Sequence, residues 1–367
     1  MSNVILYIIG GFFVVSGIDY VLGNKFNLGE KFEEGVKSMG VLALSMVGIY
    51  SLAPMISNSL GTVIIPIFNT LNLDPSIFAG SLLTTEMGGY QVAKDLALNS
   101  NIGLFSGVIL ASSLGTTISF TIPLGMGMIS REDEKYFSMG IMAGMVTIPV
   151  TCIVGGICQG LNYKDLMLSI LPVAVFSLLI GIGLLKIPNA LMKVFGFFGR
   201  AIISLSVIGL ILQGIQIIFH VQPLSGLLPY SEGLNLVGKM AIVLGGSYPM
   251  LAVINYSLKK YFDKFGEKIG INGAAVTGLI GNLASNLLAF CIFKDMDAKG
   301  KVLCTAYGVS GAFMFGGQFG FVSGVAPEMV KGFIFSKLIG GMCSIPVALW
   351  IYNRQTNRKV EASMGAA

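Results

Sequence analysis

The segment LTTEMGGYQ, from Leu83 to Gln91, places a carboxylate in the middle of an apolar chain. An ionisable side chain at membrane depth carries a large desolvation cost, so Glu86 at the centre of this segment is a candidate functional residue. Its carboxylate can be the counter-charge of a cationic solute or a proton carrier. The alternative is a structural role, either paired with Lys94 or exposed at the tip of a hairpin.

The residues around Glu86 are polar or unusually flexible. Thr84 and Thr85 carry hydroxyl groups that can satisfy either a broken helix or a ligand. Gly88 and Gly89 allow backbone conformations that other residues avoid and let a ligand approach closely, although glycine also serves simple helix packing.

Two further side chains complete the segment. The aromatic ring of Tyr90 can face an ammonium group, although tyrosine also anchors helices at membrane interfaces. Gln91 adds an amide beside it. We therefore predict that both contribute to a binding site for a small cation.

A second polar group interrupts an apolar segment in the other half of the chain. On a helix, Asn282, Ser285 and Asn286 share one face, which could recognise a hydroxyl group or form hydrogen bonds between helices. Gln318, within the glycine-rich FGGQFGF, is another polar point in a predicted span. We expect these four residues to line the same site.

Composition requires a membrane protein. Of the 367 residues, 54% are hydrophobic and 11% are charged, whereas soluble domains carry about 25% charged residues. A single histidine and five scattered cysteines argue against a metal centre, and no nucleophile–base set suggests an enzyme. We expect no cofactor and no nucleic-acid partner, and an all-α polytopic fold in the lipid bilayer.

About 20 apolar residues cross a bilayer as a helix, and about ten runs meet this criterion. Two further apolar segments, 75–93 and 271–293, are interrupted by polar residues and glycine, and we predict that they are broken or re-entrant hairpins. The ten predicted spans are 4–22, 36–53, 54–71, 102–129, 136–158, 165–185, 198–219, 237–258, 302–324 and 328–352.

Similar stretches recur in the same order in the two halves. They favour a duplicated unit over chance similarity among apolar runs, so we predict two inverted repeats, 1–160 and 161–353, the second with an insertion at about 215–248. The matched stretches are 44–49 with 205–210, 54–55 with 249–250, 83–89 with 282–286, and 144–150 with 341–347.

The distribution of lysine and arginine favours hairpins over full crossings. With the N-terminus inside, the hairpin arrangement places fifteen basic residues in cytoplasmic loops and seven outside; two full crossings, in their better orientation, give thirteen against nine. Both termini, including a short tail at 354–367, are therefore predicted to be cytoplasmic. Broken helices in inverted repeats are typical of secondary transporters, whose site lies where the broken elements meet.

Three stretches resemble the ethanolamine-utilisation transporter family, which is EutH-like: SNVILYIIGGFFVVSGIDYVLGNKFNLGEKFEEG, LTTEMGGYQ and ILASSLGTTISFTIPLGMGMI. The resemblance covers nearly the whole chain, and LTTEMGGYQ is its most specific part. It implies ethanolamine uptake across a bacterial inner membrane. The sequence leaves open a facilitator or a proton- or sodium-coupled carrier, a homo-oligomer, and another solute such as a different amine or a nucleoside-like molecule.

Overall fold

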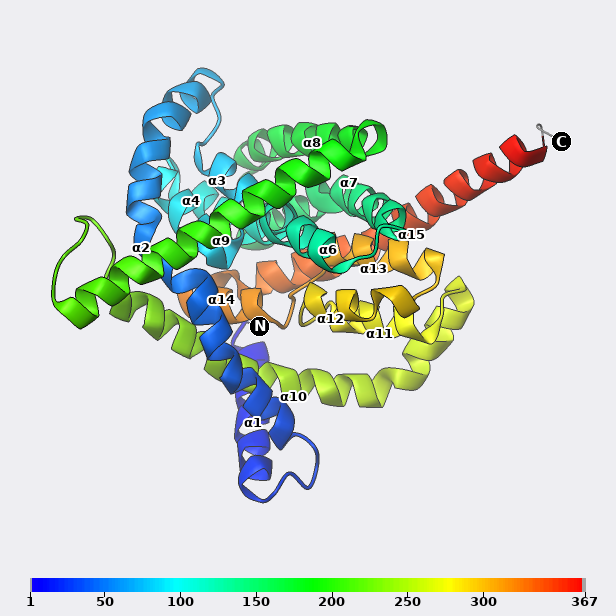
Figure 1. Cartoon of the computed structure of the whole chain (residues 1–367), viewed down its shortest axis with the longest axis horizontal. Coiled ribbons are helices and arrows are strands. Elements are labelled where there is room, and N and C mark those ends of the chain that lie inside the picture. Colours follow the sequence, from blue (N-terminus) through cyan, green and yellow to red (C-terminus); the bar gives the residue numbers. More distant parts are fainter. Residues whose placement is uncertain (1, 365–367) are drawn as a thin grey trace.

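The computed structural model describes residues 2–364, and this part of the chain consists of helices and their connections (Figure 1). Eight of these helical segments are long and apolar enough to cross a membrane, which confirms the predicted all-α polytopic fold. The longest elements are α1 (Ser2–Val21), α2 (Gly29–Thr70), α7 (Glu134–Gln159), α8 (Tyr163–Lys186), α9 (Pro188–Phe219), α10 (Tyr230–Ile269) and α15 (Val330–Met364).

Helix α2 replaces two expected spans. We predicted separate crossings at 36–53 and 54–71, but the helix continues through Pro54 and Pro66. A proline removes one backbone hydrogen bond and kinks a helix, but it does not reverse the chain direction without a polar turn. At about 1.5 Å per residue, 42 residues span roughly 63 Å, about twice the hydrocarbon thickness of a bilayer.

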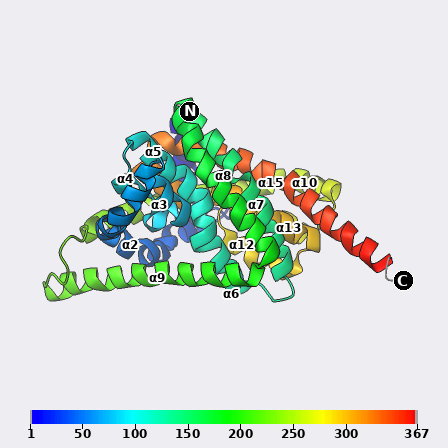
Figure 2. The same ribbon diagram turned by 90° about the horizontal axis from the view of Figure 1, so that it is seen from above.

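Helices α2 and α9 cross so closely that only glycine fits at the contact. A Cβ atom on Gly48 would overlap the backbone of Ser206 and Leu210, and one on Gly209 would overlap the backbone of Gly48. The Ser206 hydroxyl also donates to the Ser45 carbonyl at 2.8 Å. The matched stretches 44–49 and 205–210 therefore pack against each other, and α9 runs on past them along one edge of the molecule (Figure 2).

The first interrupted segment is a hairpin of α3 (Ser76–Leu82) and α4 (Tyr90–Leu96), joined by a π-helical turn η1 (Thr85–Gly89). Its two ends meet at Asp74. One carboxylate oxygen of Asp74 accepts from the backbone N–H groups of Leu98 and Asn99 at 3.1 and 2.9 Å. The chain thus returns to the point where it entered.

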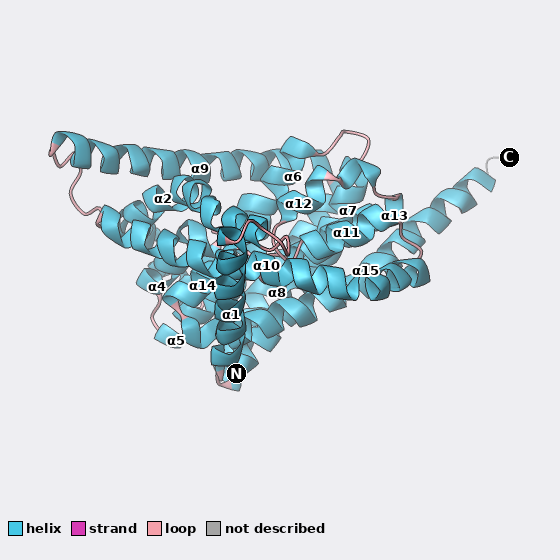
Figure 3. Cartoon of the chain, turned by 90° about the horizontal axis from the view of Figure 1, so that it is seen from below, coloured by secondary structure: helices cyan, strands magenta, loops and turns pink. Residues whose placement is uncertain are grey.

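The second interrupted segment forms a hairpin of α11 (Gly273–Gly281) and α12 (Asn286–Cys291), followed by the short helix η4 (Phe293–Asp295). Its ends are joined in a comparable way. Asp297 accepts from the Asn272 backbone N–H at 2.9 Å, and the Asn272 amide donates to the Asp295 carbonyl at 2.8 Å. In Figures 1 and 3 this hairpin and the first lie on different sides of the molecular centre.

A helical segment that follows the first hairpin runs through the buried centre of the protein. It is continuous over the predicted span 102–129 but wound more widely than an α-helix in its middle part. Its parts are α5 (Ser100–Phe105), η2 (Ser106–Gly115), η3 (Thr117–Thr121) and α6 (Ile122–Met128). We call residues 100–128 the central segment.

The predicted continuous span 302–324 is broken. It consists of α13 (Ala298–Ser310) and α14 (Gly317–Val325), separated by an irregular connection and followed by η5 (Pro327–Met329). The connection is possible because the second hairpin supplies carbonyl groups: Phe313 and Phe315 donate to Asn282 and Leu283 at 2.9 Å. Non-helical backbone at membrane depth requires such partners within the protein.

The two hairpin bases lie at opposite ends of α7. At one end, Gln159 donates to the Asn101 carbonyl at 2.8 Å, beside the first hairpin. At the other end, Asp133 forms an ion pair with Lys301 at 2.6 Å, beside the second hairpin. We call these ends the first-hairpin side and the second-hairpin side. The predicted tail 354–367 belongs to α15 as far as Met364, and 365–367 lie outside the described residues.

The close crossing of α2 and α9 predicts a selective effect of glycine substitution. Gly48→Val should lower the melting temperature in detergent, because adding methyl groups to a packed contact costs about 1–3 kcal/mol or more. Gly40→Val on the same helix is the matched control, since nothing lies within 4 Å of its Cβ position. Equal melting temperatures for both variants would contradict the described crossing.

Candidate functional site

The tip of the first hairpin is shaped by its two glycines. Gly88 has a φ of +90°, a conformation that other residues avoid. A Cβ atom on Gly89 would lie 2.6 Å from the carbonyl oxygens of Leu83 and Thr84. These two glycines let the chain turn sharply at the tip, and Glu86 lies within that turn.

Both threonines before Glu86 fasten the tip to the central segment. The Thr84 hydroxyl donates to the Thr116 hydroxyl at 2.8 Å, and the Thr84 backbone N–H donates to the Ser119 hydroxyl at 3.1 Å. The Thr85 hydroxyl donates to the Gly107 carbonyl. Because these groups bond within the protein, both threonines hold the tip in place in this structure.

Gln318 reaches the first hairpin through the same threonine. Its amide nitrogen donates to the Thr116 hydroxyl at 2.6 Å, and that hydroxyl donates to the Ala111 carbonyl at 2.8 Å. Gln318 and Thr84 both have no exposed surface. Thr116 is therefore the point at which the first tip, the central segment and α14 meet.

The tip of the second hairpin reaches the central segment through Asn286. Its amide nitrogen donates to the Thr121 hydroxyl at 2.8 Å and to the Gly308 carbonyl at 3.3 Å. The Asn282 amide donates to the Cys304 carbonyl at 2.9 Å. Because carbonyl groups only accept hydrogen bonds, these contacts fix which end of each amide is nitrogen. Both hairpin tips thus join one element, five residues apart.

Ser285 has a local role at this tip. Its hydroxyl oxygen accepts from the Leu287 backbone N–H at 3.2 Å, which makes it the N-cap of α12. Beside it, Phe313 holds a φ of +62°, and its ring packs against Phe120 with ring centroids 5.8 Å apart. A bulky residue in the left-handed region is strained, and such strain concentrates at functional sites.

Four acceptor oxygens around these tips are buried and have no hydrogen-bond partner among the described residues. The two from the second hairpin converge, since they lie 3.1 and 3.4 Å from the position that a Cβ atom on Gly308 would occupy. An unpaired buried polar group is costly, so such a set indicates a missing donor. The four oxygens are Glu86 Oε2, Asn282 Oδ1, Asn286 Oδ1 and Gln318 Oε1.

Lys337 lies within electrostatic reach of Glu86, and it was not among the site residues predicted from the sequence. Its side chain is fully buried on α15 and donates to the Ser112 carbonyl, with Nζ 5.7 Å from the centroid of the Phe333 ring. Among the described residues, no Lys337–Glu86 contact within 4.0 Å is present. Its position in the middle of the apolar run 328–352 could have marked Lys337 as a candidate functional residue, because an ionisable side chain at membrane depth is costly.

Lys94, the alternative partner of Glu86, is exposed and forms no ion pair with it in the described part of the chain. Asp19, the other carboxylate in an apolar stretch, accepts three backbone N–H groups at 3.0 Å, from Phe26, Leu28 and Gly29. It therefore shapes the turn between α1 and α2, whereas one carboxylate oxygen of Glu86 has no hydrogen-bond partner among the described residues.

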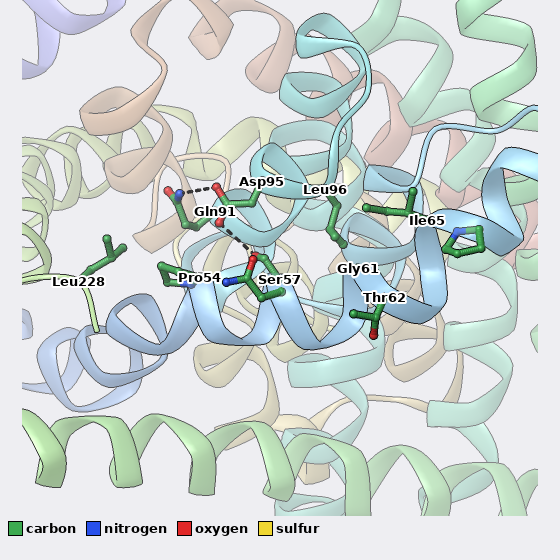
Figure 4. A pocket seen from close by; sticks show the side chains of 11 residues that line it. Pro54, Ser57, Gly61, Thr62, Ile65, Gln91, Asp95, Leu96 and Leu228 are labelled. Atoms are coloured by element: carbon green, nitrogen blue, oxygen red, sulfur yellow. Dashed lines mark hydrogen bonds between the residues drawn. The ribbon is translucent and has the colours of Figure 1, made fainter. Parts of the chain in front are cut away.

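The structure separates Tyr90 from Gln91. The Tyr90 ring packs against Phe321 of α14 with centroids 5.7 Å apart, and its hydroxyl lies 3.5 Å from the Val325 carbonyl. Gln91 points the other way, towards α2, and donates to Asp95 at 2.9 Å (Figure 4). Gln91 is therefore not brought to the polar centre between the hairpin tips.

The fold defines a multi-pass helical membrane protein with two hairpins, and buried acceptor groups without partners occur at their tips and on α14. Broken helices of this kind are typical of membrane transporters. Residues 1–351 match the family described as "Ethanolamine utilisation protein, EutH". The chain belongs to this family, whose members are permeases and not enzymes.

Relatives are similar over most of their length. The "Probable ethanolamine permease EutH" of Listeria monocytogenes is 38% identical over 98% of this chain and 96% of its own. The protein of the same name from Escherichia coli is 34% identical over 90% of this chain and 87% of its own. The "Uncharacterized protein YxeR" of Bacillus subtilis is 35% identical over 89% of this chain and 88% of its own. No solved structure matches the chain.

The shared contact at Thr116 predicts a loss of stability on substitution. Thr116→Val should lower the free energy of unfolding by about 1–3 kcal/mol, because it leaves the buried Gln318 amide without its acceptor. Thr62→Val is the control, since Thr62 is exposed and donates only within its own helix. Thermal denaturation in detergent measures both, and equal melting temperatures would exclude Thr116 as a structural link.

Proposed function

We propose that this protein carries ethanolamine, or a closely similar small amine, into the bacterial cell across the inner membrane. The observation that carries the proposal is the set of four unpaired acceptor oxygens on the two hairpin tips and on α14. A primary ammonium group offers three N–H donors and a hydroxyl offers one more, so ethanolamine can supply what this site lacks. The names of the relatives support the same substrate.

In this proposal Glu86 binds the ammonium group, and the amide oxygens of Asn282, Asn286 and Gln318 accept the remaining donors. Tyr90, on the helix that follows the tip, closes the site against α14. Thr84 and Thr85 position the tip of the first hairpin, while Gly88 and Gly89 allow this tip to bend when the site opens. Ser285 holds α12 in the orientation that points Asn286 inward.

Lys337 gives the empty site its charge balance. In this proposal its ammonium group offsets the Glu86 carboxylate when no substrate is present, which would leave the buried centre electrically neutral. A substrate cation adds a positive charge beside Lys337, which is unfavourable in a region of low dielectric constant. The lysine therefore has to move away or release its proton, and we infer that Lys337 limits how long the cation stays bound.

The order of elements in the two halves supports an inverted repeat at 1–160 and 161–353. In each half a long helix is followed by a hairpin, by a wide or broken segment, and by a helix that carries one of the matched stretches, GMVTIPV on α7 and GMCSIPV on α15. Because the hairpin bases lie at opposite ends of α7, the two halves would have opposite orientations. Helix α8 then serves as the connection between them.

Continuity of α2 changes the predicted membrane topology. We propose nine crossings in the described part of the chain, the eight candidate spans and 298–325, an arrangement that would put the two termini on opposite sides of the membrane. The segment 298–325 counts as one crossing, since Gly300 packs near the second-hairpin base and Gly324 near the start of α10. The N-terminus of α1 lies on the first-hairpin side, where α1 contacts η5.

The distribution of lysine and arginine indicates which side of the membrane each hairpin base faces. Eighteen of the 23 lysines and arginines belong to the second-hairpin side, and four, Lys94, Lys164, Lys239 and Lys331, belong to the first-hairpin side. By the positive-inside rule the second-hairpin side is cytoplasmic. The N-terminus is then outside and the C-terminus inside. The eighteen are Lys25, Lys31, Lys37, Arg131, Lys135, Lys186, Lys193, Arg200, Lys259, Lys260, Lys264, Lys268, Lys294, Lys299, Lys301, Arg354, Arg358 and Lys359.

Removing the charge of Glu86 tests the proposed function. Glu86→Gln keeps the shape of the side chain and should weaken ethanolamine binding at least a hundredfold, because breaking one side of a buried charge pair costs about 3–5 kcal/mol. Asn286→Ala should cost about 1–3 kcal/mol. Calorimetric titration measures both, and the exposed Glu267→Gln is the matched control. Native transport of ethanolamine by Glu86→Gln would contradict the proposal.

Thiol accessibility tests the topology. In a cysteine-free background, Lys25→Cys should be protected from an impermeant thiol reagent in whole cells, and Gln222→Cys should react. Both positions are exposed loop residues, so burial does not explain a difference. If both thiols react from outside, α1 and α2 are connected on the outer surface, and the nine-crossing arrangement is excluded.

A further inference from the structure

An open hollow of about 670 Å³ lies between α2 and α4, outside the polar centre (Figure 4). A volume of this size is typical of small-molecule sites. Prolines and aliphatic side chains form part of its wall, and the polar part consists of Ser57, Asn58, Thr62, Gln91 and Asp95. The function proposed above uses none of these residues.

Asp95 supplies a carboxylate to this hollow. One of its oxygens accepts from the Ser57 hydroxyl at 3.0 Å and the other from the Gln91 amide at 2.9 Å, and Figure 4 shows both contacts. These contacts fix the carboxylate in one orientation, while each oxygen keeps a free lone pair. The side chain is exposed and forms no ion pair among the described residues.

One aromatic group lies within electrostatic reach of this carboxylate but outside the wall of the hollow. It is Tyr50 of α2, which is also within electrostatic reach of Glu232 in the first turn of α10.

The hollow lies beside the helix that follows the proposed substrate site. Gln91 and Asp95 are one turn apart on α4, and α4 begins directly after the hairpin tip that contains Glu86. The hollow reaches the first-hairpin side, because the connection between α9 and α10 contributes Leu228 to its wall, and the Ser51 hydroxyl of α2 donates to the Leu228 carbonyl at 3.0 Å. This side carries five carboxylates, Asp74, Asp95, Asp165, Glu232 and Glu328, against four lysines.

We propose that this hollow is a second, outer binding site for small organic ammonium ions, in which Asp95 holds the cation before it reaches Glu86. The proposal rests on the transport function and on the outward orientation of the first-hairpin side. Because the carboxylate is exposed, the outer site binds weakly, and its effect is to raise the local concentration of cations. It should therefore act on the apparent KM of transport and not on its maximal rate.

A charge series at the hollow tests its effect on transport. At low ionic strength, Asp95→Asn should raise the KM for ethanolamine about threefold to fivefold and leave the maximal rate unchanged. Asn58→Asp, a nearly isosteric change in the same wall, should lower the KM, and the double variant should return towards the native value. Asp263→Asn, an exposed carboxylate on the second-hairpin side, is the matched control. An unchanged KM in Asp95→Asn would overturn the outer site.

A second measurement reports on the hollow without transport. In a cysteine-free background, the thiol of Asn58→Cys should react with a cationic methanethiosulfonate reagent, and ethanolamine or methylammonium should slow this reaction. Ethylene glycol, which is uncharged, should not. Protection should persist in Glu86→Gln and disappear in Asp95→Asn. Protection that survives Asp95→Asn overturns the proposal, and so does the absence of protection in the background with Asp95 intact. Failure of the central site is a separate result, because it would show as native ethanolamine transport by Glu86→Gln.

Discussion

Breaks in membrane-embedded helices leave backbone groups that no water can satisfy, and in this protein the broken elements satisfy one another. The connection between α13 and α14 donates its free N–H groups to the tip of the second hairpin. The first hairpin tip is fastened by Thr84 and Thr85 to the central segment, and the second by Asn286. If one of these elements moved, the hydrogen bonds of its neighbours would open with it, so the centre acts as a coupled unit.

This coupling explains why acceptor oxygens remain free at the centre. The amide nitrogens of Asn282, Asn286 and Gln318 are used to hold the tips together, and their oxygens are thereby directed into the interior. In the proposed function, the structural and the ligand-binding roles belong to opposite ends of the same side chains. Glu86 adds the one carboxyl group, and the buried Lys337 lies within electrostatic reach of it.

Much of the fold followed from the sequence, because polar interruptions in apolar runs have few physical explanations. The segments 75–93 and 271–293 are hairpins, and Glu86, Asn282, Asn286 and Gln318 all carry unpaired oxygens near their tips. The continuity of α2 could not be predicted, because a proline in an apolar run is compatible with either a kink or a turn. Lys337 was missed because hydropathy treats one lysine in a long apolar run as a tolerated exception.

Other differences depend on three-dimensional direction, which periodicity alone cannot supply. Gln91 follows Tyr90 directly, yet consecutive residues on a helix point about 100° apart, and the two side chains face different neighbours. The break at Phe313 depends on carbonyl groups of Asn282 and Leu283 in the second hairpin, which accept hydrogen bonds from Phe313 and Phe315. Neither local propensity nor spacing contains that contact.

A high-resolution structure with ethanolamine bound tests the central claim most directly. The account predicts density for the ligand between the two hairpin tips, with its nitrogen within hydrogen-bond distance of Glu86 and its hydroxyl beside Asn282 or Asn286. Lys337 should lie farther from Glu86 than in the empty protein. Ligand density elsewhere, with Glu86 in direct contact with Lys337, would contradict the account.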